Sequence, residues 1–98
     1  PPLVRDLSLS APEDLPAAQL EASFRRRFAE IAPPGVRLEE MRLFDLYRGA
    51  PLPPDRKALT YRLRLQAEDR TLTDEEAAEC LQRVLQDLQR ELGVSPRG

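Results

Sequence analysis

The side chains best suited to chemistry lie in two short segments in which apolar and polar residues alternate. Asp45 and Tyr47 belong to the first segment, and Thr60, Arg62 and Arg64 belong to the second. Because successive side chains of a β-strand point to opposite faces, we expect these five on one face of a sheet. A tyrosine ring offers a stacking plane, a carboxylate accepts hydrogen bonds from base edges, and guanidinium groups pair with phosphates. Single-stranded RNA is read with such groups. Alternatively, Tyr47 only covers the sheet and the arginines only keep its surface hydrated, and spacing does not choose between the two.

A hairpin from Met41 to Gln66 is expected to position these residues. Its loop, from Gly49 to Lys57, contains three prolines and is too long for a two-residue turn. Leu43 falls on the same side as Asp45 and Tyr47 by strict alternation. The side chains expected on the opposite, core-facing side are Phe44, Leu46, Leu59, Tyr61, Leu63 and Leu65.

The remaining elements complete a two-layer pattern. We predict a strand over Leu3–Ser10, with Arg5 on its apolar side and therefore at the sheet end or paired with a carboxylate. A helix over Pro16–Ile31 carries an apolar stripe at helical spacing. Its run of three arginines, from Arg25 to Arg27, is interpreted as a solvated face.

The capping box of Thr73 and Glu76 predicts the start of a second helix. Its apolar stripe runs to Leu92, and Gly93 is expected to end it. Val94–Gly98 is expected as a short last strand, which Pro96 restricts to an edge. The order β-α-β-β-α-β predicts an α+β fold, a ferredoxin-like sandwich in which two helices cover one face of an antiparallel sheet. The other face, with the five polar side chains, is then left open.

Composition excludes several classes of function. The chain has 98 residues, no histidine and one cysteine, so one domain is expected, without histidine-based acid–base chemistry or a structural zinc site. Cys80 lies on the second helix stripe and is interpreted as a small core residue. No catalytic constellation is visible, and no metal site is expected. No apolar run is long enough to span a bilayer, so no membrane partner is expected. Because the one cysteine has no disulfide partner within the chain, we expect a reducing, cytoplasmic environment.

Charge is distributed unevenly. The net charge is −2, yet the segment from Met41 to Arg70 holds seven basic and four acidic residues, which gives it +3. A partner that touches one face responds to the local field rather than to the total. The first residue is Pro1 rather than methionine, so we expect residues 1–98 to be one domain cut from a longer polypeptide.

Several separated motifs resemble one family. They are VRDLSL (4–9), RLFDLYRG (42–49), RKALTYRLRLQ (56–66), DRTLTDEE (69–76) and ELGVSPRG (91–98). In this order they are similar to the ferredoxin-fold anticodon-binding domain that closes the β subunit of bacterial phenylalanyl-tRNA synthetase. The resemblance covers nearly the whole chain.

The resemblance implies a module whose bare sheet face receives the anticodon loop of tRNA(Phe). Asp45 and Tyr47 match positions that meet the first anticodon base, the tyrosine by stacking and the carboxylate by accepting hydrogen bonds. Ala58 stands where the family commonly has a serine, so a hydroxyl contact there is lost. Aminoacylation, with ATP and Mg²⁺ as cofactors, would take place elsewhere in an α2β2 enzyme, and this domain would need none of its own. The competing hypothesis is a ferredoxin-like protein-interaction module without RNA binding.

Overall fold

The computed structural model describes residues 1–97 and contains six elements in the predicted order. They are β1 (Leu3–Pro12), α1 (Ala17–Ile31), β2 (Val36–Tyr47), β3 (Arg56–Ala67), α2 (Asp74–Leu92) and β4 (Ser95–Pro96). The predicted last strand extended to Gly98, which lies outside the described residues. Within residues 1–97 that strand is only Ser95–Pro96.

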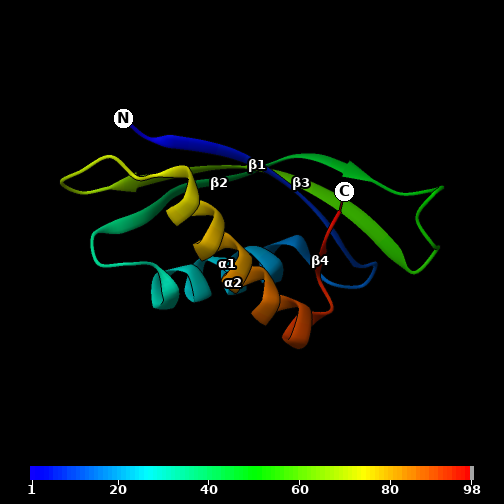
Figure 1. The fold of residues 1–98 in the computed structure, drawn as a ribbon. Coiled ribbons are helices and arrows are strands. Elements are labelled where there is room, and N and C mark those ends of the chain that lie inside the picture. The colour runs from blue at the N-terminus through cyan, green and yellow to red at the C-terminus, as the bar shows by residue number, and fades with distance from the viewer. Residues whose placement is uncertain (98) are drawn as a thin grey trace.

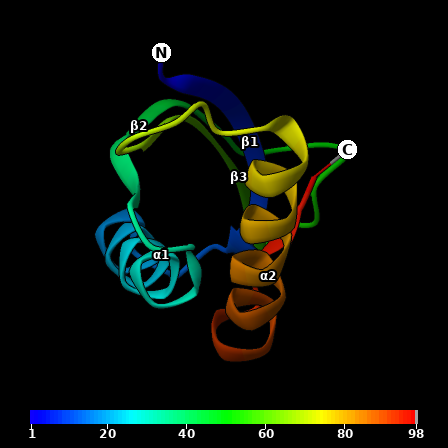
Figure 2. The same ribbon diagram turned by 60° about the vertical axis from the view of Figure 1, so that its left-hand side comes forward.

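The strands form one sheet in the order β2-β3-β1-β4, and every neighbouring pair is antiparallel. This order places the first and third strands at the centre, as the split β-α-β pattern requires. Both helices lie under the same face of the sheet, and the opposite face carries no helix (Figures 1 and 2). The predicted ferredoxin-like fold is confirmed.

The core lies between the sheet and the two helices. The β3 side chains Leu59, Tyr61, Leu63 and Leu65 are fully buried there, together with Phe24 and Phe28 of α1 and Val84 and Leu88 of α2. Arg5 lies on this side of β1, and its Nη2 donates to Asp74 Oδ1 at 2.6 Å. The expectation that Arg5 pairs with a carboxylate is therefore confirmed.

The helix ends follow from local sequence. Thr73 Oγ1 accepts from the Glu76 N–H, and the Glu76 carboxylate accepts from the Thr73 N–H, which completes the predicted capping box. Gly93 ends α2 with a φ of +70°, a conformation that favours glycine. Among the described residues, no helix is both long and apolar enough to cross a membrane.

The arginine run of α1 is only partly a solvated face. Arg25 and Arg26 are exposed, but Arg27 is half-buried and forms ion pairs with Glu30 of its own helix and with Asp87 and Glu91 of α2. The prediction is therefore wrong for Arg27, which links the two helices.

The prediction for β2 was wrong in two respects. The strand begins at Val36 rather than near Met41, and its pairing with β3 shifts register between Leu38 and Glu40 and again between Leu43 and Asp45. Each shift inserts one extra residue and so reverses the alternation that follows. As a result Leu43 packs against the core, whereas Phe44 is 44% exposed beneath Arg62 on the open face. The second shift also leaves Asp45 and Tyr47 on that face.

Candidate nucleic-acid interface

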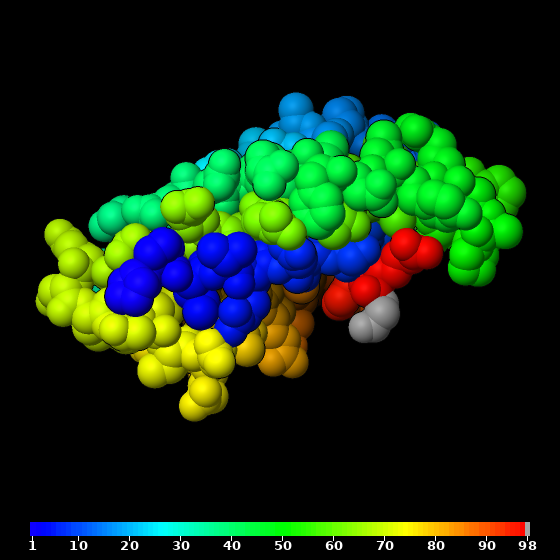
Figure 3. Space-filling model, turned by 90° about the horizontal axis from the view of Figure 1, so that it is seen from above, coloured from blue at the N-terminus to red at the C-terminus, as the bar shows by residue number. Residues whose placement is uncertain are grey.

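Figure 3 views the molecule from the open face of the sheet. Small side chains occupy the centre of this face and form what we call its floor. Ala58 of β3 lies between Tyr47 of β2 and Ser10 of β1 in the pairing register, and in the next row Thr60 lies between Asp45 and Ser8. Thr60 Oγ1 donates to Ser8 Oγ at 3.3 Å. Because these residues are short, larger groups at the edges stand above them.

Tyr47 is the largest of those groups on the β2 side. Its side chain is 41% exposed, and its hydroxyl donates to the Ala50 carbonyl at 2.5 Å, so the loop after β2 holds the ring in place. Gly49 permits this loop with a φ of +112°. Tyr47 is not tucked under the helices, and part of its ring is open to solvent.

Arg97 stands on the other side of the floor. Its N–H donates to the Ser8 carbonyl at 2.9 Å, which continues the pairing of β4 with β1. Its guanidinium carbon lies over the Tyr47 ring, 5.8 Å from the ring centroid. Tyr47 and Arg97 therefore meet above Ala58, from opposite edges of the sheet.

The segment that carries Arg97 is fixed by Arg56. The Arg56 side chain donates to the hydroxyl and the carbonyl of Ser10 and to the Gly93 carbonyl, at 3.0, 3.1 and 2.8 Å. Val94 is fully buried beside this bond. The last residues thus have a defined position at the sheet edge.

Arg62 and Arg64 both lie on the open face, as predicted, but neither is free. Arg62 makes two hydrogen bonds to Asp6, from Nε at 2.8 Å and from Nη2 at 3.0 Å. The nearest ion pair of Arg64 is with Glu40, at 3.9 Å. The hydrogen bond to Arg62 lowers the pKa of the Asp6 carboxyl, and the same bond raises the pKa of Arg62.

The five predicted residues therefore share one face but differ in surroundings. Asp45, Tyr47 and Thr60 lie at the floor, whereas Arg62 and Arg64 lie further along the sheet in ion pairs. Sequence reasoning missed Phe44, because the register shift is not visible in the alternation. It missed Arg97 because a two-residue edge strand gives little signal; the signal that could have identified it is a basic residue directly after the predicted edge position of Pro96.

The open face has only a small excess of positive charge. By the pairing register of the described residues, its arginines are Arg37, Arg42, Arg56, Arg62, Arg64 and Arg97, and its carboxylates are Asp6, Glu40 and Asp45, with Glu39 at the bulge and paired with Arg37. Arg42 makes no ion pair or side-chain hydrogen bond within residues 1–97. This face therefore suits a ligand that offers planar groups and few phosphates.

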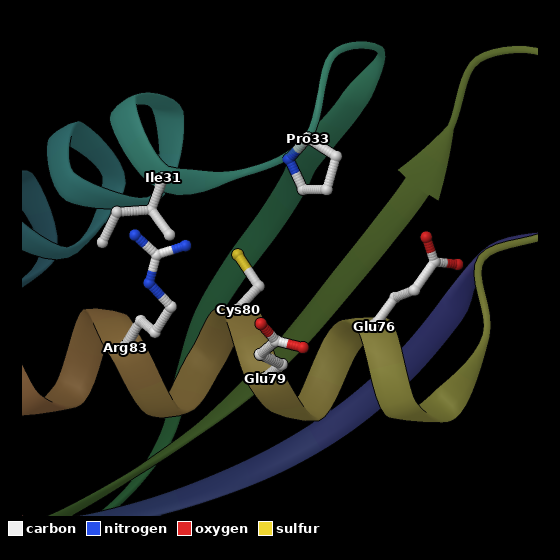
Figure 4. A pocket seen from close by; sticks show the side chains of 6 residues that line it. All are labelled: Ile31, Pro33, Glu76, Glu79, Cys80 and Arg83. Atoms are coloured by element: carbon white, nitrogen blue, oxygen red, sulfur yellow. The ribbon is translucent and has the colours of Figure 1, made fainter.

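The hollow between α2 and the end of α1, with the turn that follows α1, is a poor alternative site. It encloses about 210 Å³ and is lined by Ile31, Pro33, Glu76, Glu79, Cys80 and Arg83 (Figure 4). Burial raises the pKa of the Cys80 thiol, which is 5% exposed, so the thiolate that nucleophilic chemistry needs is disfavoured. Cys80 is a core residue, as predicted.

Comparison with known proteins identifies the family. The profile of the ferredoxin-fold anticodon binding domain matches residues 1–97. The chain belongs to this family. It is 38% identical over 97 residues to the phenylalanine–tRNA ligase β subunit of Moorella thermoacetica, a match that covers 99% of this domain and 11% of that subunit. The corresponding subunits of Geobacillus kaustophilus and Thermobifida fusca are 37% identical over 98 residues and 43% identical over 76 residues.

These matches also set the scale of the domain. The match to the Geobacillus kaustophilus subunit covers 100% of this domain and 11% of that subunit. The match to the Thermobifida fusca subunit covers 78% of this domain and 8% of that subunit. The domain thus corresponds to about a tenth of the relatives that it matches.

Proposed function

We propose that this domain binds the anticodon loop of tRNA(Phe) on its open sheet face, as one module of a cytoplasmic phenylalanine–tRNA ligase. The observation that carries the proposal is the half-exposed Tyr47 ring, held by Ala50 above a floor of small side chains. An unpaired base can stack on this ring, and the adjacent Asp45 carboxylate can accept hydrogen bonds from the edge of that base. The relatives are β subunits of this ligase, which agrees with such a role.

The floor limits what a base can touch. Ala58 has no hydroxyl and is 1% exposed beneath Tyr47 and Arg97, so it offers a bound base neither a hydrogen bond nor appreciable contact area. Thr60 already donates to Ser8 and keeps its lone pairs as acceptors. Discrimination at this position therefore comes mainly from Asp45, with Tyr47 providing affinity.

The domain's part in the enzyme is recognition rather than catalysis. Within residues 1–97 no group of three or more histidine, cysteine or acidic side chains is arranged to hold a metal ion. Activation of phenylalanine with ATP and Mg²⁺ would belong to the rest of the enzyme, which we propose to be an α2β2 assembly. The domain would hold the loop of the tRNA while the acceptor end reaches that active site.

The test is Tyr47→Ala in the full-length enzyme. Loss of the stacking plane should raise the KM for tRNA(Phe) by roughly fivefold to 150-fold, since one stacked base contributes about 1–3 kcal/mol. Formation of phenylalanyl-adenylate, which needs no tRNA, should be unchanged.

Tyr47→Phe is the matched control, because it keeps the ring and removes only the hydroxyl bond to Ala50. It should retain most of the affinity. An unchanged KM for tRNA(Phe) in Tyr47→Ala would contradict the proposal and favour a protein-interaction role for this face.

A further inference from the structure

A second planar unit lies on the open face, further along the sheet than the Tyr47 floor. The guanidinium carbon of Arg62 lies over the Phe44 ring, 5.0 Å from the ring centroid. The Asp6 carboxylate of β1 accepts hydrogen bonds from Nε and Nη2 of the same guanidinium. Phe44 is 44% exposed and the Arg62 side chain 45% exposed, so this unit faces solvent.

The β-bulge creates this unit. Without the register shift between Leu43 and Asp45, Phe44 would not share a face with Asp45. A large apolar ring on the solvent side of a sheet, covered only by a guanidinium, gains little for the core. Its placement is more consistent with a binding role.

The contacts of Arg62 indicate which role. Two parallel hydrogen bonds to one carboxylate fix the guanidinium plane and offset its charge. An arginine committed in this way is a weak phosphate ligand, because it would have to leave Asp6 first. One side of its plane lies on Phe44, and the other side can stack on a base.

We propose that Arg62 presents its guanidinium as a second stacking surface for another unpaired nucleotide of the bound loop, with Phe44 beneath it and Asp6 as its positioning residue. The inference rests on the proposed function. Phe44 and Tyr47 are three residues apart on one strand, or about 10 Å at the rise of a β-strand. At this separation we expect Arg62 and Tyr47 to take different nucleotides of the loop. The ligand of this surface is the flat face of a base, whichever of the four bases it is.

The first experiment separates stacking from charge. Binding of tRNA(Phe) to the full-length enzyme is measured over a series of salt concentrations for wild type, Arg62→Lys and Arg62→Ala. Both variants should weaken binding by about fivefold or more, because lysine keeps the charge but has no plane. The dependence of affinity on salt should stay as in wild type. Arg26→Ala, which removes an exposed charge from α1 on the other side of the molecule, is the matched control and should bind as wild type.

Asp6→Ala tests the positioning role. It should weaken binding and make the salt dependence steeper, because the released guanidinium can then reach a phosphate. A purely structural role for Asp6 would leave the salt dependence unchanged. Thermal unfolding of each variant, followed by circular dichroism, verifies that the fold is intact.

The second experiment locates the base. Single abasic nucleotides are placed along the anticodon loop, and each tRNA is measured against wild type, Arg62→Lys and Tyr47→Ala. At one position the abasic nucleotide should weaken binding to wild type but cause little further loss of affinity in Arg62→Lys. A different position should behave in this way in Tyr47→Ala.

Three results would overturn the inference: wild-type affinity in Arg62→Lys, a salt slope lowered by about one in Arg62→Ala, or the same abasic position for both residues. If Tyr47→Ala weakens binding and Arg62→Lys does not, only the second stacking surface is wrong. If Tyr47→Ala has no effect, the proposed function itself fails.

Discussion

At the scale of single residues, the hydroxyl of Tyr61 is a buried polar group without a hydrogen-bond partner. Tyr61 is fully buried under the helices, and its hydroxyl makes no hydrogen bond of normal geometry within residues 1–97, although the Glu21 carboxylate is close enough to affect its pKa. Burial, with a smaller contribution from Glu21, raises the pKa of Tyr61. The hydroxyl therefore costs stability, and the phenolate is disfavoured in the folded state.

We expect Tyr61→Phe to increase the free energy of unfolding at pH 8 by about 1 kcal/mol, the lower end of what an unpaired buried polar group costs. Because the folded-state pKa is raised, the stability linked to this group is present below the pKa of an unfolded tyrosine, about 10, and is lost as pH rises above it. Urea unfolding of the 98-residue domain measures this effect: the free energy of unfolding should fall less between pH 8 and pH 11 in Tyr61→Phe than in wild type. A variant less stable than wild type at pH 8 would show that the hydroxyl has a partner in solution.

At the scale of elements, the sequence was sufficient for the helices and for β1 and β3, because their burial follows a regular period. Leu3, Leu7 and Leu9 face the core on β1, and Leu59, Leu63 and Leu65 do so on β3. The β2 strand was not predictable in the same way. Its bulges at Glu39 and Phe44 are inserted residues, and nothing in the local residue types distinguishes an insertion from a regular strand. The side of Phe44 depends on pairing with β3, which is a tertiary property.

The interface was predictable to a similar extent. Asp45, Tyr47 and Thr60 were assigned to the open face, and they lie together there. The ion pair of Arg62 joins β3 to β1, which is distant in sequence, and that of Arg64 with Glu40 depends on the shifted register of β2, so no spacing rule reveals them. Arg97 meets Tyr47 across the full width of the sheet, and only the strand order makes this contact possible.

The capping box of α2 supports an element-scale prediction. A hydrogen bond from Arg70, and then one from the Thr73 backbone, lowers the pKa of Glu76 to about 2. Since this folded-state pKa is depressed, the stabilisation is present above the usual carboxyl value of 4.5 and is lost as pH falls towards 2. Glu76→Gln should lower the urea midpoint at pH 6 and abolish the part of the acid sensitivity that arises between these two pH values.

Glu75→Gln is the control for this measurement, because Glu75 lies in the same turn and makes no side-chain hydrogen bond within residues 1–97. Its acid sensitivity over this range should follow that of wild type. Equal acid sensitivity in wild type and Glu76→Gln would show that the capping carboxylate does not govern this range.

At the scale of the whole molecule, the small net charge of the open face predicts shallow salt dependence. Arg42, Arg56 and Arg97 are without a carboxylate partner within residues 1–97, but Arg56 is held by Ser10 and Gly93, and Arg64 is only loosely paired. Two or three phosphate contacts on a single strand give a slope of log K against log salt of about −1.4 to −2. Binding of an anticodon stem-loop to the domain, followed by fluorescence anisotropy over a potassium chloride series, measures this slope. A slope near −5 would mean that the RNA contacts another surface, such as the exposed Arg25 and Arg26 of α1.

The bond between the Tyr47 hydroxyl and the Ala50 carbonyl has a consequence for rates. Because the ring is already oriented before any partner arrives, little rotamer entropy is lost at that position on association. The association rate should then depend on how often the RNA presents a splayed base rather than on motion of the protein. Different loops should accordingly be distinguished by how long they remain bound, and the lifetime of the complex becomes the quantity in which correct and incorrect loops differ most.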